Sequence, residues 1–188
     1  MANSLQDFDE IITWYGTNRP EFRTELTSIH PNVTFLAALP DDAWQGHAVD
    51  FFLQQVGAPL GAEPSIHIEP TAQRPAILIH PSSGSPKKNW PLENFEALAK
   101  QLPRPVEWID HRFESLLDLA KWMKGASFYI GNDSGISHLA AAIGLPGLVL
   151  FGPTNPTIWR PRSKNIGVLR HELSVESMLQ KIKKRLRD

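Results

Sequence analysis

The sequence contains no cysteine, no apolar run of membrane-spanning length and no marked excess of either charge. Without cysteine, disulfides and thiolate metal sites are excluded. No apolar stretch approaches the about 20 residues that a transmembrane helix needs. The net charge of −1 gives no bias toward nucleic acid, and the histidines lack the spacing of a zinc site. We therefore expect an ordinary globular protein with no metal, no bound cofactor and no nucleic-acid partner.

Several nucleotide-binding and catalytic motifs are also missing. There is no Gly-x-Gly-x-x-Gly fingerprint and no GxxxxGK[ST] phosphate loop. The segment Gly131–Gly135 (GNDSG) does not match the GxSxG turn of hydrolases. The first ten residues are polar and acidic, which is unlike a signal peptide, so the cytoplasm is the expected compartment.

What is present is an alternation of strand-like and helix-like segments after residue 75. Unbroken apolar runs such as 76–80 (AILIH) are typical of strands buried on both faces. The pattern predicts strands at 76–80, 106–109, 127–130, 147–151 and, more weakly, 167–169. It predicts helices at 91–102, 115–123, 134–143 and 175–186. The expected fold class is therefore α/β, with a Rossmann-like parallel sheet flanked by helices.

The residues before position 76 form a different block. We expect strands near 10–14 and 33–36, a helix capped by Asn18, and a helix carrying Trp44, Phe51 and Phe52 that ends at Gly57. Residues 58–75 are rich in proline. They fit either a linker or an ordered crossover, because Ile66 and Ile68 alternate like a strand. The expected domains are thus 1–57, a connection over 58–75, and 76–188.

Ligands of parallel α/β sheets lie beyond the carboxyl ends of the strands, so the loops at those ends are the candidate sites. The loop from His80 to Pro91 carries Ser82, Ser83, Gly84 and Lys88. Hydroxyls, backbone amides near a glycine and an ammonium group together suit an anion such as phosphate. The alternative is a solvated polar loop.

The loop from Gly131 to His138 enters a short helix near Ser134, and Gly135 would let a phosphate approach the free amides there. Asp133 would repel phosphate, so it either caps the helix or binds a sugar hydroxyl. His138, one turn into the helix, is either a packed core residue or part of the same pocket.

Two further segments leave alternatives open. Thr154 and Asn155 follow the strand at 147–151 and either reach a ligand or form a proline-fixed turn. The helix at 175–186 carries a basic polar face, which is either solvated or in contact with an anionic membrane.

The two loops HPSSGSPKKNWP and YIGNDSGISHLAAAIGLPGLVLFGPTNP together resemble glycosyltransferase family 9, the ADP-heptose:lipopolysaccharide heptosyltransferases. The resemblance covers residues 76 to about 170. It implies a GT-B architecture, in which two Rossmann-like domains face each other and the nucleotide-sugar donor binds mainly to the C-terminal one. Residues 1–57 look like the closing segment of the N-terminal domain.

The resemblance also implies roles for the candidate residues. Ser82, Ser83 and Lys88 would face the donor diphosphate, amides around Ser134 and Gly135 would hold phosphate, Asp133 would contact the sugar, and His138 would line the pocket. Gly84, Asp110 and Thr154 are weaker candidates. The stretch between Val106 and Leu119 is shorter than in the family, where an acidic residue contacts the nucleoside, and Asp110 and Glu114 are the acidic residues near that place.

The implied function is an inverting heptosyltransferase that uses a nucleotide-diphospho-sugar, ADP-heptose by resemblance, in lipopolysaccharide or surface-glycan synthesis. It needs no catalytic metal. The catalytic base and the glycolipid acceptor site would belong to N-terminal parts with no counterpart here, so little transfer by this chain alone is expected. The alternative is a non-catalytic nucleotide-sugar-binding or scaffold module. The aromatic residues of the first block would either cover the core or drive self-association.

Overall fold

The computed structural model describes residues 4–110 and 113–187. The chain divides into two compact units, Met1–Gly61 and Ala62–Asp188. Each unit is described by itself below.

The second unit is built on a five-stranded parallel sheet with the order β4-β3-β5-β6-β7. Its strands are β3 (Ile77–His80), β4 (Val106–Trp108), β5 (Phe128–Asn132), β6 (Gly147–Phe151) and β7 (Ile166–Arg170). The three central strands are almost entirely buried, as their apolar sequences predict. The expected parallel α/β fold is confirmed.

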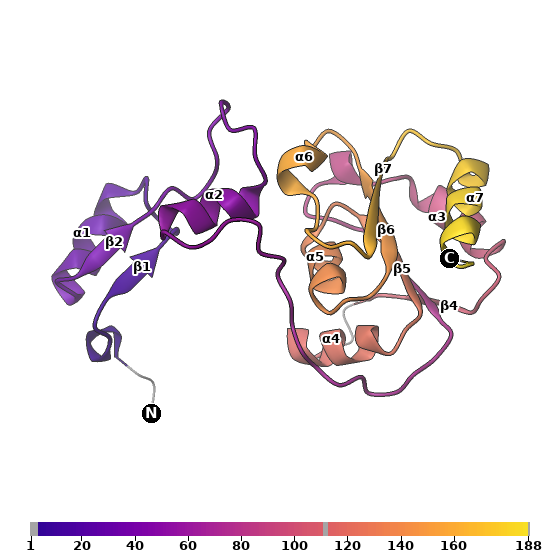
Figure 1. The fold of residues 1–188 in the computed structure, drawn as a ribbon, viewed down its shortest axis with the longest axis horizontal. Coiled ribbons are helices and arrows are strands. Elements are labelled where there is room, and N and C mark those ends of the chain that lie inside the picture. Colours follow the sequence, from indigo (N-terminus) through magenta and orange to yellow (C-terminus); the bar gives the residue numbers. More distant parts are fainter. Residues whose placement is uncertain (1–3, 111–112, 188) are drawn as a thin grey trace. The chain divides into compact units, whose positions relative to one another are not determined.

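Helices cover both faces of this sheet (Figure 1). On one face, α3 (Leu92–Ala99) and α7 (Val175–Arg185) bury Phe95, Leu98, Met178 and Ile182. On the other face, α4 (Leu116–Lys124) and α5 (Gly135–Ala142) contribute to a second buried cluster. Two short elements were not expected from the sequence: the 3-10 turn η2 (Pro86–Lys88) and the four-residue helix α6 (Pro156–Trp159).

The proline-rich segment before β3 is attached to the second unit. Its backbone amides at Ile66, Thr71 and Arg74 donate hydrogen bonds to carbonyls of Ala142, Lys121 and Gly125. It forms no strand, so the alternation of Ile66 and Ile68 did not predict one correctly. Ile68 instead packs against the core on the α4–α5 face, which gives this stretch an ordered course.

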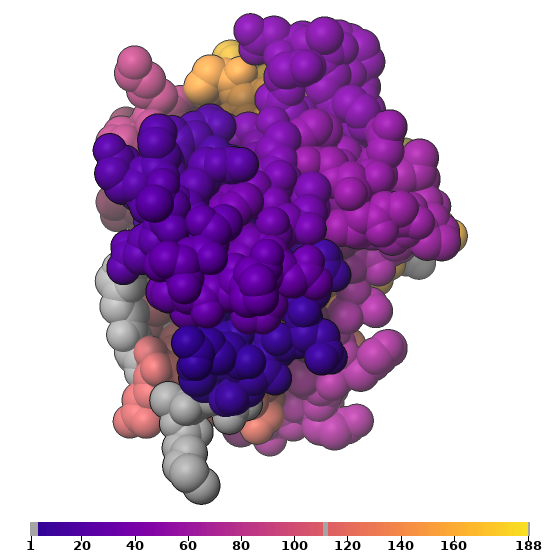
Figure 2. Space-filling view, turned by 90° about the vertical axis from the view of Figure 1, so that its left-hand side faces the viewer, coloured from indigo at the N-terminus to yellow at the C-terminus, as the bar shows by residue number. Residues whose placement is uncertain are grey.

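The first unit contains a 3-10 turn, η1 (Leu5–Asp7), a parallel pair of strands, β1 (Ile11–Thr13) and β2 (Val33–Phe35), and two helices, α1 (Pro20–Ile29) and α2 (Ala48–Gln55). Figure 2 shows the surface of this unit in indigo and purple. Many of its large apolar side chains are exposed, among them Tyr15 and Leu39.

Two local expectations in this unit were wrong. Arg19, and not Asn18, is the N-cap of α1, with Pro20 in the first turn. The Arg19 side chain makes no capping hydrogen bond, because a guanidinium has no acceptor. Trp44 lies before α2, whose N-cap is His47, because the His47 ring accepts a hydrogen bond from the Val49 amide and begins the helix there.

None of the helices in residues 4–110 and 113–187 combines the length and apolarity that a bilayer span requires.

Candidate functional site

The carboxyl ends of β3, β5 and β6 bring the three selected loops to one edge of the sheet. Two hollows open there. One lies between the β3 loop, the start of α5 and the β6 loop, and has a volume of about 490 Å³. The other lies between the ends of β3 and β4 and the start of α4, and has a volume of about 370 Å³.

The first hollow, named here the central pocket, gathers most of the candidates selected from the sequence. Trp159 of α6 also lines it and was not selected, because a four-residue helix leaves no periodic pattern. The complete lining is Gly84, Lys88, Asp133, Ser134, Gly135, His138, Thr154 and Trp159.

An ion pair joins the two main loops inside the central pocket. The Lys88 ammonium lies 2.9 Å from Oδ2 of Asp133, and the side chains are 34% and 6% exposed. Oδ2 is buried and accepts no hydrogen bond of normal geometry, so the contact is one of charge. Lys88 therefore neutralises a carboxylate that would otherwise be buried alone.

Asp133 does not cap α5, which corrects one of the two alternatives from the sequence. The N-cap is Ser134, and no side chain makes a capping hydrogen bond. The Asp133 backbone amide instead donates to the Leu150 carbonyl, which places the carboxylate at the end of β5 beside Lys88.

The first turn of α5 is open to the central pocket. Among the described residues, the amides of Gly135 and Ile136 donate no hydrogen bond within the chain. A Cβ on Gly135 would meet no atom within 4 Å. Free amides at a helix N-terminus attract anions, and the glycine leaves room for one.

His138 and Thr154 complete the wall of the pocket. His138 is exposed, so it is not the packed core residue that the sequence allowed. Asn155 caps α6: its side chain accepts a hydrogen bond from the Thr157 amide, and Pro156 follows in the first turn, as the proline-fixed turn predicted.

Asn132 was missed from the sequence, although it holds the β3 loop in place. Its side chain is fully buried, its Nδ2 donates to the Pro81 carbonyl at 2.6 Å, and its Oδ1 accepts from the Trp90 amide at 3.0 Å. One amide thus fixes both ends of the loop that carries Lys88. An asparagine at the end of an apolar strand was the available signal.

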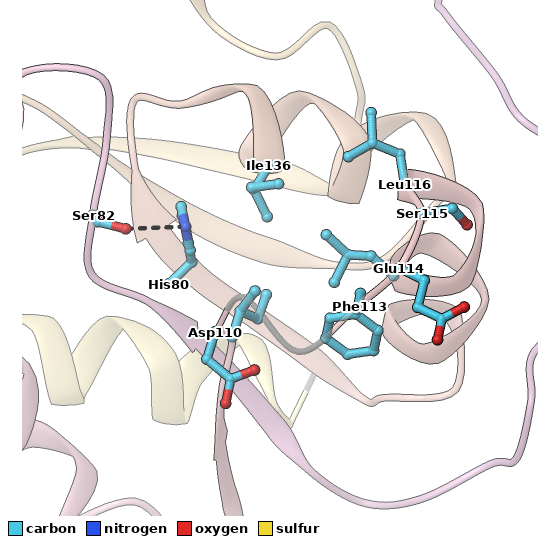
Figure 3. A pocket seen from close by; sticks show the side chains of 10 residues that line it. His80, Ser82, Asp110, Phe113, Glu114, Ser115, Leu116 and Ile136 are labelled. Atoms are coloured by element: carbon cyan, nitrogen blue, oxygen red, sulfur yellow. Dashed lines mark hydrogen bonds between the residues drawn. The ribbon is translucent and has the colours of Figure 1, made fainter.

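The second hollow, named here the side pocket, is drawn in Figure 3. His80 and Ser82 lie on one side of it, and Phe113 and Glu114 come from the other. Ser82 and Asp110, both predicted site residues, line this pocket and not the central one. The rest of the lining is Ser115 and four apolar side chains: Ile109, Leu116, Leu119 and Ile136.

A chain of polar side chains runs between the two pockets. His80 Nε2 lies 3.2 Å from Ser82 Oγ, and its Nδ1 lies 3.4 Å from Ser134 Oγ. Ser137 Oγ donates to the Asn132 carbonyl and lies 2.9 Å from the buried Tyr129 hydroxyl. Burial raises the pKa of Tyr129 well above its ordinary value, so this hydroxyl stays neutral.

Ser83 lines neither pocket. Its hydroxyl lies 2.7 Å from Asn89 Oδ1 and 2.9 Å from the Ser85 carbonyl, within donating distance of both. This hydroxyl stabilises the loop from within, and its contact with a ligand stays a prediction.

The part of the chain that the structure describes brings together no cluster of three or more histidine, aspartate or glutamate side chains that would suit a metal ion. The Lys88 ammonium and the first turn of α5 are the positive groups at the central pocket.

A known protein family matches part of this chain. The model of glycosyltransferase family 9 (heptosyltransferase) matches residues 114–186. This range includes Asp133, Ser134, Gly135 and His138.

Curated relatives match over short segments. Lipopolysaccharide heptosyltransferase 1 of Salmonella typhimurium is 36% identical over 80 residues, which are 42% of this chain and 25% of that protein. The enzyme of the same name from Pseudomonas aeruginosa is 52% identical over 42 residues, 22% of this chain and 12% of that protein. The matched segments thus span a quarter or less of these relatives' length.

Solved structures share the fold over most of the chain. Escherichia coli ADP-heptose lipopolysaccharide heptosyltransferase II gives a TM-score of 0.71 at 18% identity, over 96% of this chain and 71% of that one. E. coli heptosyltransferase WaaC, solved with ADP, gives 0.66 at 21% identity, over 95% and 73%. These chains have the GT-B fold, which this chain shares. Over residues 114–186 its sequence is similar to glycosyltransferase family 9.

Proposed function

We propose that the second unit binds a nucleotide-diphospho-sugar, ADP-heptose, and serves a heptosyltransferase of lipopolysaccharide or surface-glycan synthesis. The observation that carries this proposal is the central pocket, where a lysine, an open helix N-terminus and a carboxylate meet. E. coli heptosyltransferase WaaC was solved with ADP. The family match includes the carboxylate and the helix N-terminus of this pocket, but not the lysine.

The diphosphate would lie between Lys88 and the first turn of α5. Two free amides, the helix dipole and one ammonium offset the two negative charges of the diphosphate. Because Gly84 and Gly135 present no Cβ to the pocket, phosphate oxygens can reach the backbone there. Lys88 would then stand between the phosphate and Asp133 and partner both.

The sugar would lie beside Asp133 and His138. A carboxylate accepts hydrogen bonds from sugar hydroxyls and so discriminates a sugar from a bare nucleotide. The Lys88 ammonium orients this carboxylate through a contact with one of its two oxygens, Oδ2.

The nucleoside would occupy the side pocket. A planar base suits the apolar walls formed by Phe113, Leu116 and Ile136, and the polar rim offers Asp110 and Glu114 to ribose hydroxyls. The two pockets border each other at Ser134 and Ile136, so one ligand can extend from the base to the sugar.

In the proposed reaction, an acceptor hydroxyl oxygen attacks the anomeric carbon with inversion, and the bond from that carbon to the diphosphate oxygen breaks. ADP leaves, and the hydroxyl proton passes to a base that is not among the residues assigned here. Lys88 and the α5 amides stabilise the charge that develops on the leaving diphosphate. These groups accelerate bond cleavage without a divalent cation.

Calorimetric titration with ADP, UDP and GDP tests the proposal. Wild type should bind ADP, Lys88→Ala should lose that binding, and the matched variant Lys87→Ala should keep it, because Lys87 is exposed and lines neither pocket. Failure of wild type to bind any of the three nucleotides would overturn the donor site.

A binding module without turnover is the second candidate. Asp133, the buried carboxylate of the central pocket, is paired with Lys88 and is therefore poorly placed to accept an acceptor proton. Release of ADP when the chain is incubated with ADP-heptose and a lipopolysaccharide acceptor would rule out the module, because a module without turnover releases no ADP.

A further inference from the structure

A third hollow lies far along the strands from the two pockets above. It has a volume of about 450 Å³ and is formed by β6, β7 and the last turns of α7. Leu148 and Gly167, which are paired in register, belong to the amino ends of their strands, whereas the central pocket lies at the carboxyl ends. We name this hollow the α7 groove.

Cations surround the α7 groove. Lys181, Lys184 and Arg185 line it, and no carboxylate does. Within residues 4–110 and 113–187, none of the three forms an ion pair, and all are exposed. The groove thus has a local excess of positive charge, although the chain as a whole has a net charge of −1.

The spacing of these cations opposes helix stability in the absence of an anion. Lys181 stands three residues from Lys184 and four from Arg185, so the pairs lie on one face of α7 and repel each other. Their position in the last turns offsets part of that cost through the helix dipole. A bound anion would remove the remaining repulsion.

Gly167 gives the groove its depth. A Cβ at this position would lie 2.6 Å from a guanidinium nitrogen of Arg185 and 2.7 Å from Leu148. The missing side chain therefore lets Arg185 lie across the strand and leaves a hollow above Leu148. The result is an apolar floor with three cations around its mouth.

We propose that the α7 groove is a second anion site that takes the phosphate ester of an anionic phospholipid headgroup, so that this flank of α7 faces a membrane. A bilayer surface fits because the groove gathers three exposed cations at the end of α7, more charge than one soluble phosphate ester would neutralise. The apolar face of α7 is buried against the sheet through Met178 and Ile182, so the contact is electrostatic and involves no helix insertion.

Flotation of the full chain with vesicles tests this, and α7 supplies a matched control. Lys181→Gln/Lys184→Gln removes two cations of the groove. Lys183→Gln/Arg187→Gln removes two cations outside it, for the same change in charge. Vesicles of phosphatidylcholine alone are compared with vesicles that also contain phosphatidylglycerol, without nucleotide present.

Wild type should float only with the phosphatidylglycerol vesicles. The Lys181→Gln/Lys184→Gln variant should have a vesicle–water partition coefficient roughly 30-fold lower than that of wild type. The Lys183→Gln/Arg187→Gln control should lower the partition coefficient by much less. Equal losses of vesicle binding in the two variants would overturn the groove as the site, and so would failure of wild type to float. Stabilisation by glycerol 3-phosphate without vesicle binding would overturn the lipid as its source.

Vesicle binding by the α7 groove does not depend on the proposed donor site. Lys88→Ala should float as wild type does, because Lys88 lies at the opposite edge of the sheet. A chain that binds vesicles but no nucleotide would refute the proposed function and leave the α7 groove intact.

Discussion

The Lys88 ammonium lies 2.9 Å from the Asp133 carboxylate and thereby joins the loop after β3 to the loop after β5. The carboxylate is nearly buried, whereas a third of the lysine side chain remains exposed. A phosphate can therefore approach Lys88 from its exposed side while Asp133 holds the ammonium in place. The ion pair has a structural role and, in the proposed donor site, a ligand-binding role. Mutation can separate the two.

The first prediction separates these parts by thermal unfolding and ADP titration. Lys88→Met should destabilise the fold by about 1–2 kcal/mol, because it leaves a buried carboxylate without a counterion, and the partial exposure of the lysine limits the cost. Adding Asp133→Asn should restore most of the stability, since the charge is gone. The double variant should still bind no ADP. Recovery of binding together with stability would show that Lys88 serves the fold alone.

The second prediction concerns two glycines of the β5–α5 region. Gly135→Ala should leave the melting temperature unchanged or slightly raised, because the added Cβ meets no atom and alanine favours helix. It should nevertheless weaken ADP binding by at least about tenfold, since the methyl group occupies the space of a phosphate oxygen.

Gly131→Ala is the contrasting variant. Its Cβ would clash with the hydroxyl of Tyr129, which is fully buried and cannot move aside, so a stability loss of about 1–3 kcal/mol is expected. If Gly135→Ala bound ADP as wild type does, the phosphate would not lie against the first turn of α5.

The third prediction assigns Asn132 to loop anchoring. Asn132→Asp keeps an acceptor for the Trp90 amide but replaces the donor to the Pro81 carbonyl with an oxygen, so two oxygens face each other in a buried place. We expect a loss of about 1–3 kcal/mol and faster hydrogen exchange at the Trp90 amide. Unchanged exchange at Trp90 would contradict the anchoring role.

Much of the fold could be predicted from the sequence, and the reason is physical. Central parallel strands are buried on both faces, so β3 and β6 appear as unbroken apolar runs bounded by glycine and proline. The meeting of the selected loops at one place followed from the topology, because the carboxyl ends of neighbouring strands lie at one edge of the sheet.

What could not be predicted depends on contacts between distant residues. Lys88 and Asp133 are 45 positions apart, and neither shows in its own segment that the other is its partner. Ser82 and Lys88 line different pockets, and Lys88 lies in the 3-10 turn η2, which leaves no periodic signal in three residues. The α7 groove likewise depends on a glycine and an arginine from separate elements.

The fourth prediction concerns alkaline stability. The Tyr129 hydroxyl lies 2.9 Å from Ser137 Oγ in a fully buried position, and burial raises the pKa of this phenol above its ordinary value of about 10. In the unfolded chain the phenol ionises near pH 10, while in the folded chain it stays protonated. Its contribution to the free energy of unfolding is therefore fully present below about pH 10 and is lost as pH rises toward the raised pKa.

Tyr129→Phe tests this contribution through urea unfolding between neutral and strongly alkaline pH. At neutral pH the variant should lose about 1 kcal/mol, because the Ser137 hydroxyl loses a partner but keeps its bond to the Asn132 carbonyl. Above about pH 10 the stability of wild type should fall more steeply than that of the variant, so the two curves converge. Parallel curves would mean that the phenol reaches solvent in the folded state, and that the hydroxyl chain between the two pockets is open to water.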